Sequence, residues 1–144
     1  MARTNNIMPL ASPPVLTTIV TILAVFITIS VFYLIISALK GRRFNTKLAV
    51  ITIIINIVTL LLFEINRTKP VTSIPAVTFF GAVHGIFGVA AIAAFIILIK
   101  LAHNYNKAEM NYIQSHHRFP YFILFLWLTS FLTGETLYFL MYVV

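Results

Sequence analysis

Apolar and polar positions along the chain fall into long blocks. Four apolar runs, at about 15–39, 48–65, 77–99 and 119–143, are separated by short polar stretches. A helix that crosses a bilayer needs roughly 20 mostly apolar residues, and open strands cannot satisfy their backbone groups in hydrocarbon. The pattern therefore predicts an all-α fold, an integral membrane four-helix bundle. Residues 1–144 are expected to form a single membrane domain.

Basic residues concentrate on one side of this predicted topology. The connections after the first and third runs carry seven of them, Lys40, Arg42, Arg43, Lys47, Lys100, Lys107 and Arg118, against three on the other side, Arg3, Arg67 and Lys69. Cytoplasmic loops are enriched in lysine and arginine. The asymmetry predicts a multi-pass protein of the cell membrane with both termini on the outer side. The first run is too long for the core of a signal peptide, so we expect the first helix to be retained.

Composition narrows the possible functions. Of the 144 residues, 60% are hydrophobic and 9% are charged, and the mean hydropathy is +1.01. Little chain remains for a catalytic domain outside the bilayer. The net charge of +7 is explained by the ends of the helices, so nucleic acid is not expected as a partner. Because the chain has no cysteine, disulfides, thiolate ligands and a cysteine nucleophile are excluded.

Three ionisable residues are expected inside the membrane. Glu64, His84 and Glu135 come from three different runs, and a helical rise of about 1.5 Å per residue brings all three to the same outer layer. A charge near the bilayer centre costs at least about 2.5 kcal/mol, so these residues form the candidate intramembrane polar site. The small residues Gly81, Gly85 and Gly88 flank His84 in a G-x-x-x-G arrangement that predicts close helix packing.

Several roles remain open for these groups. His84 is held by Glu64, ligates a metal or haem, or belongs to a proton or quinone-type site. Glu135 faces the interior, a partner protein or the outer surface. Asn56, which shares a helix face with Thr52 and Thr59, is expected to form an interhelical hydrogen bond.

The cytoplasmic side carries the other histidines. His103, His116 and His117 lie near Arg118, where they would bind a metal, a haem propionate through Arg118, or anionic lipid headgroups. Trp127 is expected to pack in the core. The chain shows no serine–histidine–acid set, phosphate loop or metal motif, so no catalytic residue is predicted, the metal is unknown, and the protein is not expected to be an enzyme.

The stretch "HHRFPYFILFLWLTSFLTG" has a recognisable pattern. His116, Trp127, Thr133 and Gly134, with His84 early in the third run, resemble the pattern of domain-of-unknown-function family four-twenty. That family consists of small four-helix membrane proteins and includes a factor needed to make active haem-copper terminal oxidase. The resemblance covers residues of the second to fourth runs. It departs from the family at Asn45 and Arg67, where members tend to carry histidines, so two of four presumed ligand positions are absent.

Three functions follow as hypotheses. The resemblance implies a non-catalytic accessory or assembly subunit of a membrane metalloenzyme complex, such as a haem-copper terminal oxidase or a membrane copper monooxygenase, with other integral membrane subunits and the lipid bilayer as partners. The first alternative is a haem-binding electron carrier, although the histidines lie at unmatched depths for paired ligation. The second is a small proton- or ion-conducting protein built on Glu64, His84 and Glu135. The sequence names no cofactor beyond the possibility of haem.

Overall fold

The computed structural model describes residues 15–65, 75–108 and 110–142, with the side chains of Glu64, Ile65 and Tyr142 outside that description. This part of the chain forms five helices and no strand: α1 (Val15–Leu39), α2 (Thr46–Ile65), α3 (Pro75–Lys107), α4 (Tyr112–Ser115) and α5 (Arg118–Tyr142). The helices α1, α2, α3 and α5 are long and apolar enough to cross a membrane. The all-α prediction is confirmed for the described residues, and the four apolar runs indicate a multi-pass membrane protein.

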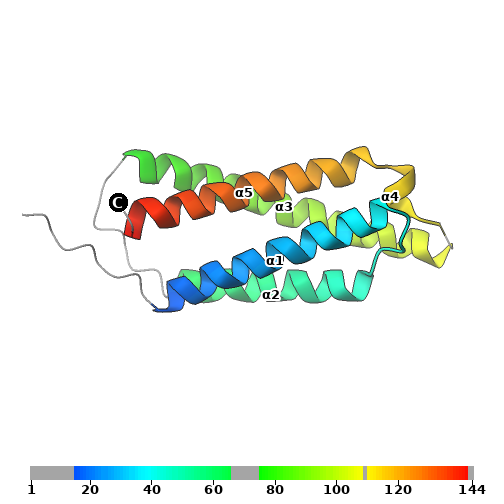
Figure 1. The fold of residues 1–144 in the computed structure, drawn as a ribbon, viewed down its shortest axis with the longest axis horizontal. Coiled ribbons are helices and arrows are strands. Elements are labelled where there is room, and N and C mark those ends of the chain that lie inside the picture. Colours follow the sequence, from blue (N-terminus) through cyan, green and yellow to red (C-terminus); the bar gives the residue numbers. More distant parts are fainter. Residues whose placement is uncertain (1–14, 66–74, 109, 143–144) are drawn as a thin grey trace, which may run out of the picture.

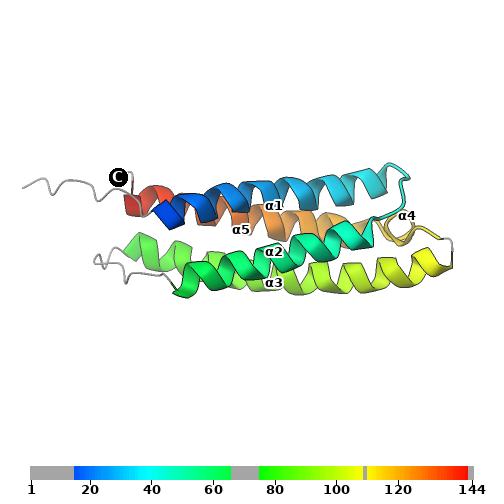
Figure 2. The ribbon, with the colours of Figure 1, turned by 90° about the horizontal axis from the view of Figure 1, so that it is seen from below.

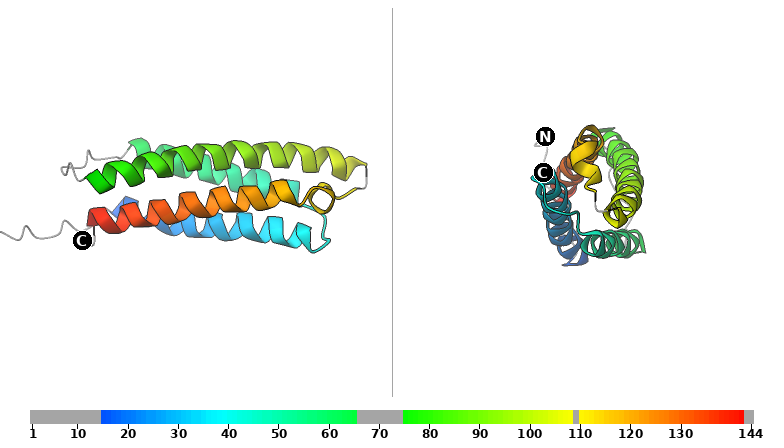
Figure 3. Two further views of the ribbon diagram at one scale, coloured as in Figure 1. Left: turned by 90° about the horizontal axis from the view of Figure 1, so that it is seen from above. Right: turned by 90° about the vertical axis from the view of Figure 1, so that its right-hand side faces the viewer.

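The four long helices run side by side, each antiparallel to the next in the chain (Figures 1 and 2). Seen along their axes they form a ring in the order α1, α2, α3, α5, and α3 and α5 share the most extensive contact (Figure 3). Leu39, Thr46 and Arg118 lie at the end that also holds α4, which we call the α4 end. Val15, Pro75 and Tyr142 lie at the opposite end, which we call the terminal end.

Helix α3 is longer than the sequence pattern predicts. It continues to Lys107, so Lys100 and Lys107, which the sequence pattern predicts in the connection after the third run, lie on the helix. The fall in hydropathy after Ile99 marks a change of surroundings, but Lys100, Leu101 and Ala102 are good helix formers and continue the helix. Tertiary contacts hold the extension, because Ala102 is buried and the side-chain amide of Asn106 donates to the carbonyl of Phe44, 2.9 Å away.

Asn111 ties the two connections at the α4 end together. Its side-chain oxygen accepts hydrogen bonds from the amides of Ile113 and Gln114 and so caps α4. Its side-chain NH₂ group donates to the carbonyls of Ala38 (3.2 Å) and Arg42 (3.1 Å). Asn111 therefore links α4 to the end of α1 and to the connection between α1 and α2.

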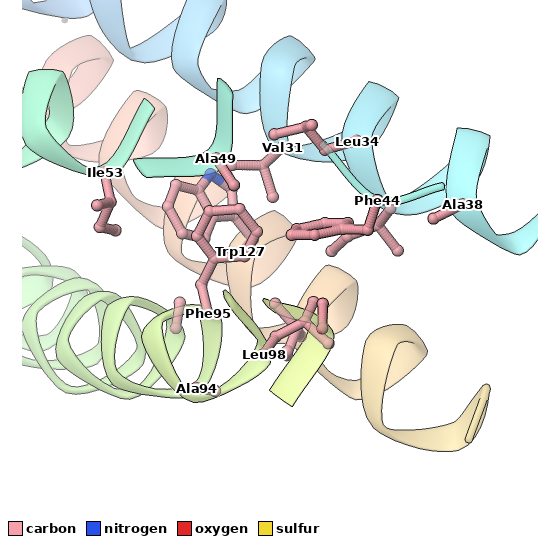
Figure 4. Packing of buried hydrophobic residues seen from close by; sticks show 14 of the residues in the cluster. Val31, Leu34, Ala38, Phe44, Ala49, Ile53, Ala94, Phe95, Leu98 and Trp127 are labelled. Carbon is pink, nitrogen blue, oxygen red and sulfur yellow. The ribbon is translucent and has the colours of Figure 1, made fainter. Parts of the chain in front are cut away.

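The hydrophobic core fills only the half of the molecule next to the α4 end. Phe95 and Trp127 pack edge to face with ring centroids 5.5 Å apart, and Phe44 packs against Phe95 at 6.5 Å (Figure 4). The rest of this cluster comes from all four long helices and α4, and it includes Val31, Leu34, Ile35, Ala38, Ala49, Ile53, Ala94, Leu98, Ile113 and Ile123. Toward the terminal end the described interior is not filled in this way.

The outer surface matches a membrane environment. Large apolar side chains are exposed on every long helix, for example Phe26, Ile54, Ile86 and Phe125. The seven basic residues that the sequence pattern predicts on the cytoplasmic side are all exposed and lie toward the α4 end. Arg3, Arg67 and Lys69, the three basic residues that the sequence pattern predicts on the outer side, lie outside the described residues. Pro120 stands in the first turn of α5, where its missing N–H breaks no helical hydrogen bond.

Candidate functional site

A cavity of about 620 Å³ occupies the half of the molecule that the core leaves unfilled. All four long helices line it, from Trp127 and Ile27 at its inner limit to Leu16, Val77 and Met141 near the terminal end. Most of its walls are apolar. Among the described residues, its polar lining consists of Thr17, Thr21, Thr28, Asn56, Thr59, His84, Ser130, Glu135 and Tyr138.

The best-defined polar contact joins α3 to α5. Nδ1 of His84 lies 2.7 Å from the carbonyl oxygen of Ser130, and Oγ of Ser130 lies 3.5 Å from the same nitrogen. Two glycines make this approach possible. A Cβ built on Gly134 would lie 2.8 Å from Cε1 of His84, and one built on Gly88 would lie 3.2 Å from Oγ of Ser130. The imidazole therefore fills a notch that Gly134 leaves on α5.

This contact fixes which ring nitrogen of His84 carries hydrogen. A carbonyl oxygen only accepts, so Nδ1 must be the donor to Ser130. In a neutral imidazole the other nitrogen, Nε2, then carries a lone pair. Within the described part of the chain Nε2 has no hydrogen-bond partner. His84 thus presents an oriented acceptor at the cavity.

Glu135 lies at the same level of the bundle as this histidine. It follows Gly134, against which the imidazole packs, and it lines the same cavity. Among the described residues Glu135 has neither a hydrogen-bond nor an ion-pair partner, and it forms no ion pair with His84. A carboxyl group inside an apolar span without a protein partner is costly.

The other predicted members of the site behave differently. The side chain of Glu64 lies outside the described residues, so the expected pairing with His84 is not described; the described partner of His84 is Ser130. A Cβ on Gly81 or Gly85 would meet no atom of a described residue within 4 Å. The close helix packing expected at these two glycines is therefore absent, because they border open cavity, and Gly88 alone of the three meets α5.

Asn56 does not form the expected bond between helices. It lines the cavity, and no described residue hydrogen-bonds to its side chain. Thr52 and Thr59 donate to carbonyls of their own helix, those of Leu48 and Ile55, at 2.9 and 2.8 Å. The hydrogen bonds of Thr52 and Thr59 therefore stay within α2 and do not join it to its neighbours.

The remaining histidines belong to the α4 end. His116 stacks on Tyr112 with ring centroids 4.6 Å apart and meets the edge of Tyr105 at 5.9 Å. His103, His116 and His117 are exposed. From Arg118 to Ser130 the helix rises about 18 Å, so His84 and His116 do not share one site. In the described part of the chain no three histidine, aspartate or glutamate side chains gather as a metal site.

Trp127 closes the inner limit of the cavity. It is buried, as expected, and its Nε1 donates to Oγ1 of Thr28 at 3.3 Å. The sequence interpretation did not select Thr28 or Ser130. Ser130 had a signal that could have revealed it: it stands one helical turn before Gly134, the arrangement that opens a notch on one helix face.

Comparisons of this chain with protein-family models, with curated proteins and with solved structures find no match.

Proposed function

We propose that this protein is a four-span membrane bundle with both termini on the outer side of the cell membrane, and that it serves as a non-catalytic accessory or assembly subunit of a membrane metalloenzyme complex. A haem-copper terminal oxidase and a membrane copper monooxygenase are the two parent complexes considered. The resemblance of His84, His116, Trp127 and Gly134 to family four-twenty motivates this proposal.

The observation that carries the proposal is the cavity between the four long helices. Its polar groups are suited to holding a molecule, because hydrogen bonds orient two of them. The His84 ring is oriented by its hydrogen bond to the Ser130 carbonyl, and the Thr28 hydroxyl accepts a hydrogen bond from Trp127. A protein that holds a small molecule inside the membrane, and whose described residues lie almost entirely in spans, suits a supporting role beside a larger enzyme.

A haem-binding electron carrier is the second candidate, favoured by the orientation of His84. Histidines that ligate metals usually donate their second ring N–H to a carbonyl or carboxylate, as Nδ1 of His84 does to Ser130. Ligation by two histidines has no support here, since His103, His116 and His117 lie at the α4 end. A reduced-minus-oxidised spectrum of the purified protein without haem bands would remove this candidate.

Proton conduction is less well supported, because the half of the molecule next to the α4 end is packed. Val31, Phe95, Leu98 and Ile123 are fully or almost fully buried in the core cluster there. A proton path from His84 and Glu135 would have to cross this apolar region without polar partners. We therefore rank proton conduction below the accessory role and the haem-binding electron carrier.

Orientation can be tested directly because the chain contains no cysteine. Ser115→Cys introduces one thiol at the exposed end of α4. We expect a membrane-impermeant maleimide to label it in inside-out vesicles and not in intact cells, with Lys69→Cys showing the opposite pattern. Labelling of Ser115→Cys from outside intact cells would reverse the proposed topology.

The accessory role is tested by extracting the protein from its native membrane in mild detergent and weighing the intact particle by native mass spectrometry. A large assembly that contains oxidase or monooxygenase subunits is the expected result. A lone monomer or homo-oligomer, together with normal assembly of the enzyme in a strain lacking the gene, would refute it.

A further inference from the structure

The cavity offers a binding position whose chemistry can be specified. His84 and Glu135 lie at one level, because the His84 ring packs on Gly134, the neighbour of Glu135. Nε2 of His84 accepts a hydrogen bond when the ring is neutral, and the Glu135 carboxyl accepts when ionised and also donates when protonated. Neither group has a partner among the described residues. The ligand must therefore bring at least one donor.

Several classes of head group fail this requirement. Ethers, esters and ketones only accept, so they leave Nε2 of His84 unmatched. A phosphate brings negative charge next to a carboxyl group in a low-dielectric region, where like charges repel strongly. An ammonium group has donors but must be stripped of its water to enter the apolar cavity, and it pairs with Glu135 only when that carboxyl group is ionised. A hydroxyl donates and accepts and is neutral, so it complements Glu135 in either protonation state.

The size and the apolar walls of the rest of the cavity indicate that the body of the ligand is apolar. A volume of about 620 Å³ falls within the usual range for small-molecule sites, roughly 300–1,000 Å³. Apolar side chains such as Val20, Ile27, Ile92 and Phe131 form the walls on either side of the His84 level. Trp127 closes the cavity seven positions before Gly134 on α5, about 10 Å along the helix.

We propose that this cavity binds a neutral lipid with a hydroxyl head group, which donates a hydrogen bond to Nε2 of His84 and pairs with the carboxyl group of Glu135 while its apolar chain occupies the space bounded by Trp127. This assignment rests on the proposed accessory function, which is non-catalytic. The lipid is therefore bound and not chemically converted. A free long-chain alcohol and an isoprenoid alcohol or quinol share this chemistry.

The single tryptophan of the chain supplies the measurement. Trp127 lines the cavity and is only 6% exposed, so a quencher in bulk lipid reaches it poorly. The full-length protein is placed in phosphatidylcholine liposomes and titrated with 8-bromooctan-1-ol, whose bromine quenches indole fluorescence. Its methyl ether and the corresponding amine, 8-bromooctylamine, are the matched probes.

We expect the alcohol to quench Trp127 saturably and at least tenfold more tightly than the ether. Equal quenching by alcohol and ether, or tighter binding of the amine, would overturn the hydroxyl assignment. Competition by unlabelled decanol or by an isoprenoid quinol then distinguishes the two sources of the hydroxyl, and the stronger competitor identifies the physiological class.

Two substitutions test the residues. Glu135→Leu and His84→Phe are each expected to weaken the alcohol at least fivefold without changing the response to the ether. Thr136→Val is the control, since Thr136 bonds to the Leu132 carbonyl of its own helix and does not line the cavity. Helical circular dichroism verifies folding of each variant, and unchanged alcohol binding in both folded cavity variants would refute the site. Because these titrations use purified protein, they can fail while native mass spectrometry still finds the large assembly, and the reverse also holds.

Discussion

The imidazole ring of His84 on α3 packs against Gly134 on α5, in the space that the missing side chain of this glycine leaves. The space that a Cβ on Gly134 would occupy lies 2.8 Å from Cε1 and 3.0 Å from Nδ1 of His84. The missing side chain lets the imidazole reach the Ser130 carbonyl on the same helix. The contact between α3 and α5 at this level and the orientation of the cavity's histidine therefore depend on one glycine.

Gly134→Ala is expected to destabilise the protein by about 1–3 kcal/mol, because the added methyl group forces the His84 ring off Ser130 or separates α3 from α5. Unfolding in a denaturing detergent, followed by Trp127 emission, measures the loss. Gly85→Ala is the matched control. Its added methyl group meets no atom within 4 Å, so it should be neutral or stabilise by up to about 1 kcal/mol. An equal loss in both variants would contradict the notch.

The His84 tautomer can be observed directly. We expect the ¹⁵N spectrum of the imidazole rings to show hydrogen on Nδ1 of His84, because that nitrogen donates to the Ser130 carbonyl. The signal is assigned by its disappearance in His84→Gln. His117, which is exposed, serves as the comparison. A His84 ring protonated on Nε2 alone would exclude the described hydrogen bond.

Phe95→Ala is expected to cost about 3 kcal/mol or more, because Phe95 is fully buried between Trp127 and Phe44 and its removal leaves a cavity in the packed half. Phe26→Ala is the control. Phe26 is 63% exposed on α1, where lipid chains can replace its contacts, so its loss should cost less than about 1 kcal/mol. Detergent unfolding of both variants makes the comparison, which fails if the two losses are alike.

Asn111→Ala is expected to cost about 1–2 kcal/mol, since it removes the cap of α4 and leaves the carbonyls of Ala38 and Arg42 without this donor. The amides of Ile113 and Gln114 should exchange with deuterium faster than in the unaltered protein. Asn104→Ala, at an exposed position of α3 without a side-chain hydrogen bond to a described residue, should leave this exchange unchanged. Unaltered protection in Asn111→Ala would show that α4 does not depend on its cap.

The sequence by itself determined the four apolar helices, because hydrocarbon demands long stretches of internally bonded backbone whatever they pack against. Val15–Leu39 matches its predicted bounds. The end of α3 did not follow from the pattern, since hydropathy reports where lipid ends and Ala102 and Asn106 continue the helix by contacts with distant residues. The same holds for Asn111, whose partners are about 70 positions away.

For the candidate site, too, the sequence determined some features and the tertiary structure decided others. The sequence selected His84 and Glu135, because ionisable groups inside an apolar run are conspicuous wherever they point. Only the tertiary structure decided that His84 meets Ser130 over Gly134, that Gly81 and Gly85 border open space, and that Trp127 separates a packed half from a hollow one. The physical reason is that helix rotation and neighbour choice depend on the shape of side chains on two helices at once, and neither helix encodes this alone.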